Sequence, residues 1–144
     1  MKVLTRLLLV AVLCWGAFGT AAAQDVEASE MVQGGMQAIR MIDQGRIGEL
    51  WDGATAATRK RIARTDFAAK VSGSRSALGA PLQRTWVAVK RRAVADPDAE
   101  AAGQYVSIEY ETRFSNKPDG TLRELVSFHL DSDRIWRFSG YALH

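Results

Sequence analysis

The 144-residue chain is poor in the residues that carry redox and metal chemistry, with one cysteine and two histidines. Cys14 lies inside an N-terminal apolar run, and Leu13 before it is not the small residue that precedes a lipid-modified cysteine. Disulfide bonds within the chain are therefore excluded, and lipid attachment is not expected. A domain without disulfides depends on its hydrophobic core for stability.

The histidines and acidic residues do not have the spacing of a metal site. The acids of residues 96–100 alternate as in a calcium loop, but Ala101 and Ser107 stand where such a loop needs Gly and Glu. His129 and Asp131 share a strand face, yet zinc needs at least three protein ligands. We therefore expect no metal and no cofactor.

The first 23 residues have the organisation of a cleavable signal peptide. Lys2 and Arg6 form a basic region, and the apolar run of residues 7–18 is too short to span a bilayer comfortably. Ala21-Ala22-Ala23 fits the small-x-small motif of a signal peptidase, so we predict cleavage after Ala23. We expect a periplasmic protein without stable membrane insertion, in which residues 24–144 form one domain.

The charge of the predicted mature chain is nearly balanced. The chain carries 19 basic and 16 acidic residues, and loss of the two basic residues of the signal peptide leaves a net charge of +1. General attraction to nucleic acid is therefore not expected. Two basic clusters, Arg59-Lys60-Arg61 with Arg64 and Lys90-Arg91-Arg92, could together meet anionic lipid or polysaccharide. A solvated face is the favoured interpretation.

Hydrophobic periodicity divides the mature chain into a helical half and a strand half. Apolar residues recur at helical spacing in residues 25–45, 47–54 and 65–79. Residues 55–63 could form one or two further helical turns. From Arg84 the period becomes two, in runs around residues 86–89, 106–114, 124–130 and 136–142. This order predicts an α+β fold, with about three N-terminal helices packed on a four-stranded curved antiparallel meander.

Glycines predict where the backbone turns or approaches another element. Gly34-Gly35 weakens the first helix by up to ~1 kcal/mol per glycine relative to alanine, which predicts close packing against another element. Gly45 is expected to end this helix. Gly140 marks a bulge or a close backbone approach in the last strand.

Strict alternation assigns faces to the first and last strands. In the first strand it places Val87 and Val89 on one face. In the last strand it places Trp136, Phe138 and Ala142 in the core, and it turns Arg137, Ser139 and Tyr141 to the opposite face.

Several short motifs occur in an order that is typical of one family. They are Met41-Ile42-Asp43-Gln44-Gly45 with Trp51, Arg75-x-x-Leu78-Gly79 with Arg84, Gly103-x-Tyr105-Val106 continuing to Asn116-Lys117, Glu124-x-Val126, and Trp136-Arg137-x-x-Gly140-Tyr141. Over about residues 37–143 the chain resembles the exported bacterial family called domain of unknown function 4019. The resemblance implies a helix-backed curved sheet of the cystatin-like or nuclear-transport-factor-2-like kind, without an assigned activity. Such proteins usually carry a glycine in the turn before the final tryptophan, where this chain reads Asp131-Ser132-Asp133-Arg134.

A carboxylate on the apolar face of the sheet is the strongest candidate for a functional group. Glu124 shares the parity of its apolar strand neighbours, and a buried carboxylate needs a cation or several hydrogen bonds. The two candidate partners are Arg75 and Arg84. Arg75 lies roughly 50° from the apolar stripe of its helix, close enough to turn inward. Tyr110 and Thr112 are expected close by, and a small cavity could lie beneath Tyr110 and Trp136.

The pairing of Glu124 with an arginine has two interpretations. As a structural ion pair it would fix a helix against the sheet, and this is the favoured interpretation. As the polar end of a small pocket it would leave the arginine to hold an anionic ligand bidentately.

Three functions follow from this site. The favoured one is a non-enzymatic periplasmic domain that binds a small ligand or an envelope partner. The second is an enzyme of the nuclear-transport-factor-2-like type, in which Glu124 transfers protons. The third is a structural envelope protein without a pocket. The sequence identifies neither the ligand nor the oligomeric state.

Overall fold

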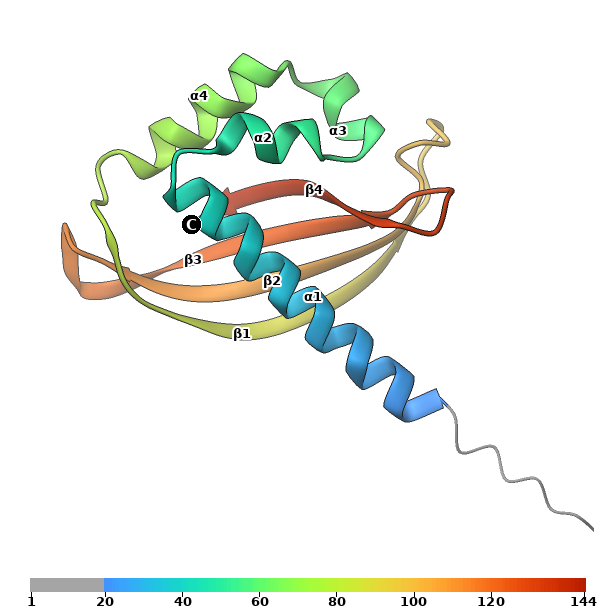
Figure 1. The fold of residues 1–144 in the computed structure, drawn as a ribbon, viewed down its shortest axis with the longest axis horizontal. Helices are drawn as coiled ribbons and strands as arrows, with labels where there is room; N and C mark the ends of the chain where they lie inside the picture. The colour runs from blue at the N-terminus through green and yellow to red at the C-terminus, as the bar shows by residue number, and fades with distance from the viewer. Residues whose placement is uncertain (1–19) are drawn as a thin grey trace, which may run out of the picture.

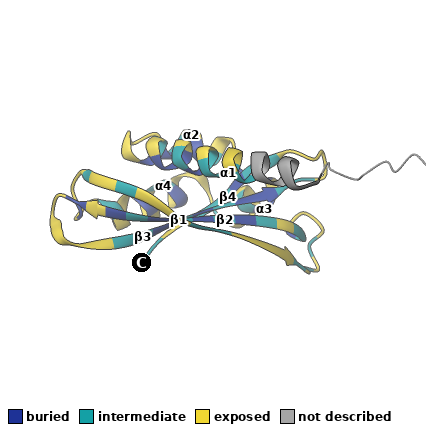
Figure 2. Ribbon diagram, turned by 90° about the horizontal axis from the view of Figure 1, so that it is seen from below, coloured by how far each residue is buried: buried dark blue, intermediate teal, exposed yellow. Residues whose placement is uncertain are grey.

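The structure, a computed structural model, describes residues 20–144, and it describes the side chains of residues 28–144. The elements are α1 (Thr20–Asp43), α2 (Ile47–Asp52), α3 (Ala56–Arg61), α4 (Arg64–Arg75), β1 (Pro81–Val94), β2 (Gly103–Phe114), β3 (Lys117–Leu130) and β4 (Trp136–Leu143). The strands form one antiparallel sheet in the order β1-β2-β3-β4 (Figure 1). The helices lie on one side of this sheet (Figure 2). The predicted α+β fold is confirmed, and α3 is a fourth helix in the segment that the periodicity left open.

Helix α1 begins at Thr20, earlier than the predicted start at residue 25, and ends at Asp43. Gly45 ends it as predicted, because its φ of +74° allows the Arg46 N–H to donate to the Met41 carbonyl over 2.8 Å. The signal-peptide prediction falls mostly on residues 1–19, outside the described residues, and stays a prediction. Among the described helices, none has both the length and the apolar character needed to cross a bilayer.

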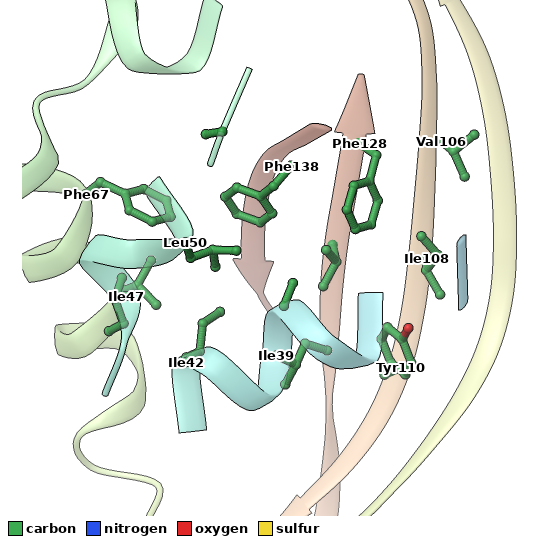
Figure 3. Packing of buried hydrophobic residues seen from close by; sticks show 14 residues of the cluster. Ile39, Ile42, Ile47, Leu50, Phe67, Val106, Ile108, Tyr110, Phe128 and Phe138 are labelled. Atoms are coloured by element: carbon green, nitrogen blue, oxygen red, sulfur yellow. The ribbon is translucent and has the colours of Figure 1, made fainter. Parts of the chain in front are cut away.

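The hydrophobic core fills the space between the helices and the sheet (Figure 3). Helix α1 contributes Ile39 and Ile42 to it, at helical spacing. The Phe138 ring meets the rings of Phe67 and Phe128 edge to face, with centroids 5.9 Å and 6.5 Å apart. Phe138 on β4 therefore connects helix α4 with strand β3 through one aromatic cluster.

The glycine pair of α1 lies where this helix packs most closely on the sheet. A Cβ atom on Gly35 would overlap the hydroxyl of Tyr110 on β2, and one on Gly34 would contact the Phe128 ring. The Tyr110 hydroxyl donates a hydrogen bond of 2.7 Å to the Val32 carbonyl. This confirms the predicted close approach, and it shows why glycine is present despite its low helix propensity.

A β-bulge on β4 changes which residues face the core. The pairing with β3 skips Ser139, so Phe138 and Tyr141 both point toward the helices. The predicted alternation was wrong here, because one extra residue shifts every later side chain to the other face. Ala142, predicted to be core, is exposed. Gly140 has open space around it, which agrees with the bulge rather than with a close approach.

A second bulge interrupts β1 at Val87, between Trp86 and Ala88. Val87 is 40% exposed, whereas Val89 packs against the core, so the two valines do not share a face as predicted. The bulge again explains the difference, because it restarts the alternation one residue later.

Candidate functional site

Both arginines proposed as partners of Glu124 bind it. The Arg84 Nε donates to Glu124 Oε1 over 2.7 Å, and the Arg75 Nη1 donates to Oε2 over 3.3 Å. The Glu124 side chain is completely buried, and those of Arg75 and Arg84 are 11% and 9% exposed. The Arg75–Glu124 and Arg84–Glu124 pairs therefore both occur, and together they join α4, β1 and β3.

Asp43, at the end of α1, is a second acid in this cluster. It accepts hydrogen bonds from Arg75 Nη2 at 2.5 Å and from Arg84 Nη1 at 2.8 Å. Two carboxylates and two guanidinium groups then give a cluster with no net charge. Asp43 was not among the predicted site residues; its signal was an acid at the last helical position before Gly45, within one of the family motifs.

Two hydroxyl groups complete the hydrogen bonds of Glu124. Thr112 Oγ1 donates to Oε1 over 2.5 Å, and the Tyr141 hydroxyl donates to Oε2 over 2.6 Å. Thr112 was expected near Glu124. Tyr141 was assigned to the opposite face, and the bulge at Ser139 turns it inward.

The electrostatics of the cluster favour the charged forms of Asp43, Arg75 and Arg84. Burial would raise the pKa of Asp43, but hydrogen bonds from Arg84 and Arg75 outweigh burial and lower it. Burial would lower the pKa of both arginines, but the hydrogen bond to Asp43 and the nearby negative charge outweigh burial and raise it. Burial and the neighbouring Glu124 raise the pKa of Tyr141, so Tyr141 is a neutral donor.

This geometry gives Glu124 little capacity for proton transfer. Its four acceptor sites are occupied by two arginines, a threonine and a tyrosine, and its side chain has no exposed surface. A general base needs a free lone pair within reach of a substrate proton. The cluster is suited to fixing the helices against the sheet, which is the favoured sequence interpretation.

Tyr110 and Trp136 lie outside this cluster. Tyr110 is opposite Glu124 in the strand pairing, but its hydroxyl is bound to α1, and burial raises the pKa of Tyr110 to about 12. Trp136 pairs with Leu130 at the far end of β4, roughly 20 Å along the sheet from Glu124. It is half-buried against the core. The five predicted site residues therefore do not line one pocket.

A second polar cluster ties the start of α3 to the β3–β4 turn. Asp131 accepts hydrogen bonds from Thr55 at 2.7 Å and from Arg137 at 2.9 Å, and the His129 Nδ1 lies 2.7 Å from it. The other ring nitrogen of His129 lies 2.8 Å from the Ala102 carbonyl. Within residues 28–144, no three His, Cys, Asp or Glu side chains gather as metal ligands.

The basic clusters are largely paired with acids. Lys60 contacts Asp98 and Glu100 at 3.7 Å and 3.3 Å, and Arg64 pairs with Asp52 at 2.8 Å. Lys90 pairs with Glu109 at 2.6 Å. This agrees with a solvated face of exposed ion pairs rather than a continuous basic surface.

A groove with a volume of about 400 Å³ lies between α4 and β4. Its strand wall is the unbroken run of residues 139–143, and its helix wall consists of Thr58, Arg61, Ile62, Phe67, Lys70, Val71 and Ser74. We call it the α4–β4 groove. Its lining includes the apolar side chains of Ile62, Phe67 and Val71, its two charged residues are both cations, and none of its lining residues is acidic.

The cations of the α4–β4 groove are accessible. The Arg61 side chain is 64% exposed and contacts Asp96 at 3.4 Å, outside the groove. Lys70 is exposed and has no ion-pair partner among the described residues. Tyr141 also lines the groove, and its hydroxyl donates to Glu124 in the buried cluster.

These features define a class: an α+β domain whose described helices cover one face of an open antiparallel sheet and leave a groove along one sheet edge. The chain belongs to the family described as Protein of unknown function (DUF4019), which matches residues 34–141. This confirms the family resemblance. Comparisons with curated proteins and with solved structures gave no match. The family description names no activity.

Proposed function

We propose that this protein is an exported, non-enzymatic binding domain, and that the α4–β4 groove is its ligand site. The ligand would be an anion with an apolar portion. The observation that carries this proposal is the groove's composition: apolar side chains beside two exposed cations, with no acid in the lining. Such a combination of apolar walls and few polar groups is common in small-molecule sites.

The buried cluster supports a binding role over catalysis. Its charges neutralise one another, and the Glu124 carboxylate has no exposed surface that could reach a substrate. The periplasmic location rests on the N-terminal sequence, where a basic region, an apolar run and an Ala-x-Ala site follow in order. Amino-terminal sequencing of protein recovered from the periplasm would test it, with Gln24 as the expected first residue.

The binding role can be tested with a matched pair of fluorescent probes. The anionic dye 8-anilinonaphthalene-1-sulfonate carries an apolar body and one negative charge, and N-phenyl-1-naphthylamine is a neutral counterpart. We expect saturable binding of the anionic dye. Lys70→Gln should weaken it roughly two- to fivefold, as for loss of an exposed ion pair.

Two controls make this result specific to the groove. Lys70→Gln should leave binding of the neutral dye unchanged, because only the charge is removed. Lys117→Gln, which removes an exposed lysine at the start of β3, should leave both affinities unchanged. Absence of saturable binding, or equal effects of the two lysine substitutions, would contradict the proposal.

A further inference from the structure

The α4–β4 groove runs along a backbone edge of the sheet. β4 is a terminal strand in the order β1-β2-β3-β4, so one of its sides has no neighbouring strand. Side chains of consecutive strand residues alternate between faces. A groove lined by all of residues 139–143 must therefore follow the open edge of the strand and not one of its faces.

The register identifies which backbone groups point into the groove. Arg123 and His144 exchange two backbone hydrogen bonds, of 2.7 Å and 2.9 Å, just beyond the end of β4. In an antiparallel pair, residues that bond to the neighbour alternate with residues that point away from it. Ala142 therefore bonds to β3, and the N–H and C=O groups of Tyr141 and Leu143 point to the open edge. Neither α3 nor α4 donates to or accepts from these groups within the described residues.

The groove is closed at one end. The Thr55 N–H donates to the Phe138 carbonyl over 2.8 Å, and the Thr58 hydroxyl donates to the Ser139 carbonyl over 2.8 Å. An added strand would have to stop at this point. Arg61, the last residue of α3, lines the groove on this side, where a terminal carboxylate would meet a cation.

The other sheet edge is less suited to the same role. β1 has bulges at two positions, where its register skips Leu82 and Val87. Bulges interrupt the regular row of edge donors and acceptors, and they commonly prevent pairing with another strand. Beyond Ser139 the edge of β4 is regular.

We propose that the ligand of the α4–β4 groove is the carboxyl-terminal segment of a protein or peptide, which adds to β4 as a fifth, antiparallel strand. This inference rests on the proposed function and specifies its ligand. The backbone groups of Tyr141 and Leu143 bind the peptide backbone through up to four hydrogen bonds, and the terminal carboxylate lies toward Arg61. The direction is fixed, since the carboxylate lies at the closed end beside Ser139.

Fluorescein-labelled Val-Thr-Val-Thr-Val with a free carboxylate is a suitable probe, and fluorescence anisotropy measures its affinity. We expect saturable binding. A peptide N-methylated at the two backbone amides that would face Tyr141 and Leu143 should bind about tenfold more weakly, because it loses both of its hydrogen-bond donors to β4. The carboxyl-terminal amide should also bind more weakly.

A substitution in the strand tests the same hydrogen bonds from the other side. Leu143→Pro removes an N–H that points to the open edge, where proline is tolerated. Leu143→Ala keeps this N–H and is the matched control, with thermal unfolding of both variants confirming the fold. Peptide binding should be weaker in the proline variant than in the alanine variant. In the unsubstituted protein, peptide should slow hydrogen exchange at the Tyr141 and Leu143 amides.

The possible results separate the two proposals. If the peptide and its N-methylated form bind equally while the anionic dye binds as expected, strand addition is wrong and the anion site stands. The same holds if only the dye binds. If neither binds, both proposals fail. If the Tyr141 and Leu143 amides are protected in the free protein and lose protection on dilution, a second copy of the chain occupies the edge and the peptide proposal is overturned.

Discussion

Substitution of Glu124 by Gln should strongly destabilise this domain. Gln keeps the size of the side chain but removes the negative charge that two buried arginines share. Removal of one partner from a buried ion pair typically costs about 3–5 kcal/mol, because the remaining charge is left without compensation. Domains of this size are stabilised by roughly 5–15 kcal/mol in total. The loss would therefore be a large fraction of the whole.

A double-mutant cycle would assign this energy to its partners. Urea unfolding should be followed by tryptophan fluorescence for Glu124→Gln, Arg84→Gln, Arg75→Gln and the two doubles that include Glu124. Both couplings should exceed ~0.5 kcal/mol. The coupling to Arg84 should be the larger, because its Nε lies 2.7 Å from the carboxylate while the Arg75 contact is 3.3 Å. The Nε of Arg75 is also buried without a hydrogen-bond partner in the described part.

The control is an exposed carboxylate of the same sheet. Glu111 pairs with Arg123 over 2.8 Å, with side chains 42% and 39% exposed. Glu111→Gln should cost less than about 1 kcal/mol, as exposed pairs do. A loss for Glu124→Gln as small as that for Glu111→Gln, or a coupling to Arg75 larger than that to Arg84, would refute this account of the cluster.

Three further predictions concern the backbone and pH. Gly35→Ala should lower the free energy of unfolding despite the higher helix propensity of alanine, because its Cβ would overlap the Tyr110 hydroxyl. Gly35→Ala combined with Tyr110→Phe should recover part of this loss in urea unfolding. Arg134→Gly should raise stability by about 1 kcal/mol, since Arg134 has a φ of +67° in the turn before β4; an unchanged unfolding midpoint would contradict this. Stability should fall as the pH drops below about 4, because the pKa of Asp43 is lower in the folded protein than its usual 3.8. Asp43→Asn should make this decline shallower.

The sign of the pH effect follows from proton binding. The unfolded chain protonates Asp43 near its usual pKa of 3.8, whereas the folded protein protonates it only at lower pH. Acid therefore favours the unfolded state, and the contribution of Asp43 is fully present only above that pKa. Equal pH dependence in the Asp43→Asn variant and the unsubstituted protein would show that Asp43 has no such role.

Local periodicity was sufficient to predict the elements and most of the core. Helical spacing located α1, α2 and α4, and period-two alternation located the four strands, because both patterns depend on neighbours in the sequence. The burial of Glu124 followed from the same parity argument. Its pairing with arginine followed from the need to compensate a buried charge.

The tertiary structure decided the features that depend on register and on distant contacts. The bulge at Ser139 turns Tyr141 toward Glu124. Alternation along the sequence cannot reveal such an extra residue, because it depends on how the strand pairs with β3. Asp43 and Glu124 are far apart in the chain, and only the packing of α1 on the sheet gives them the same two arginines. The open edge of β4 is likewise a property of strand order, which is set by long-range pairing and determines where a groove can form.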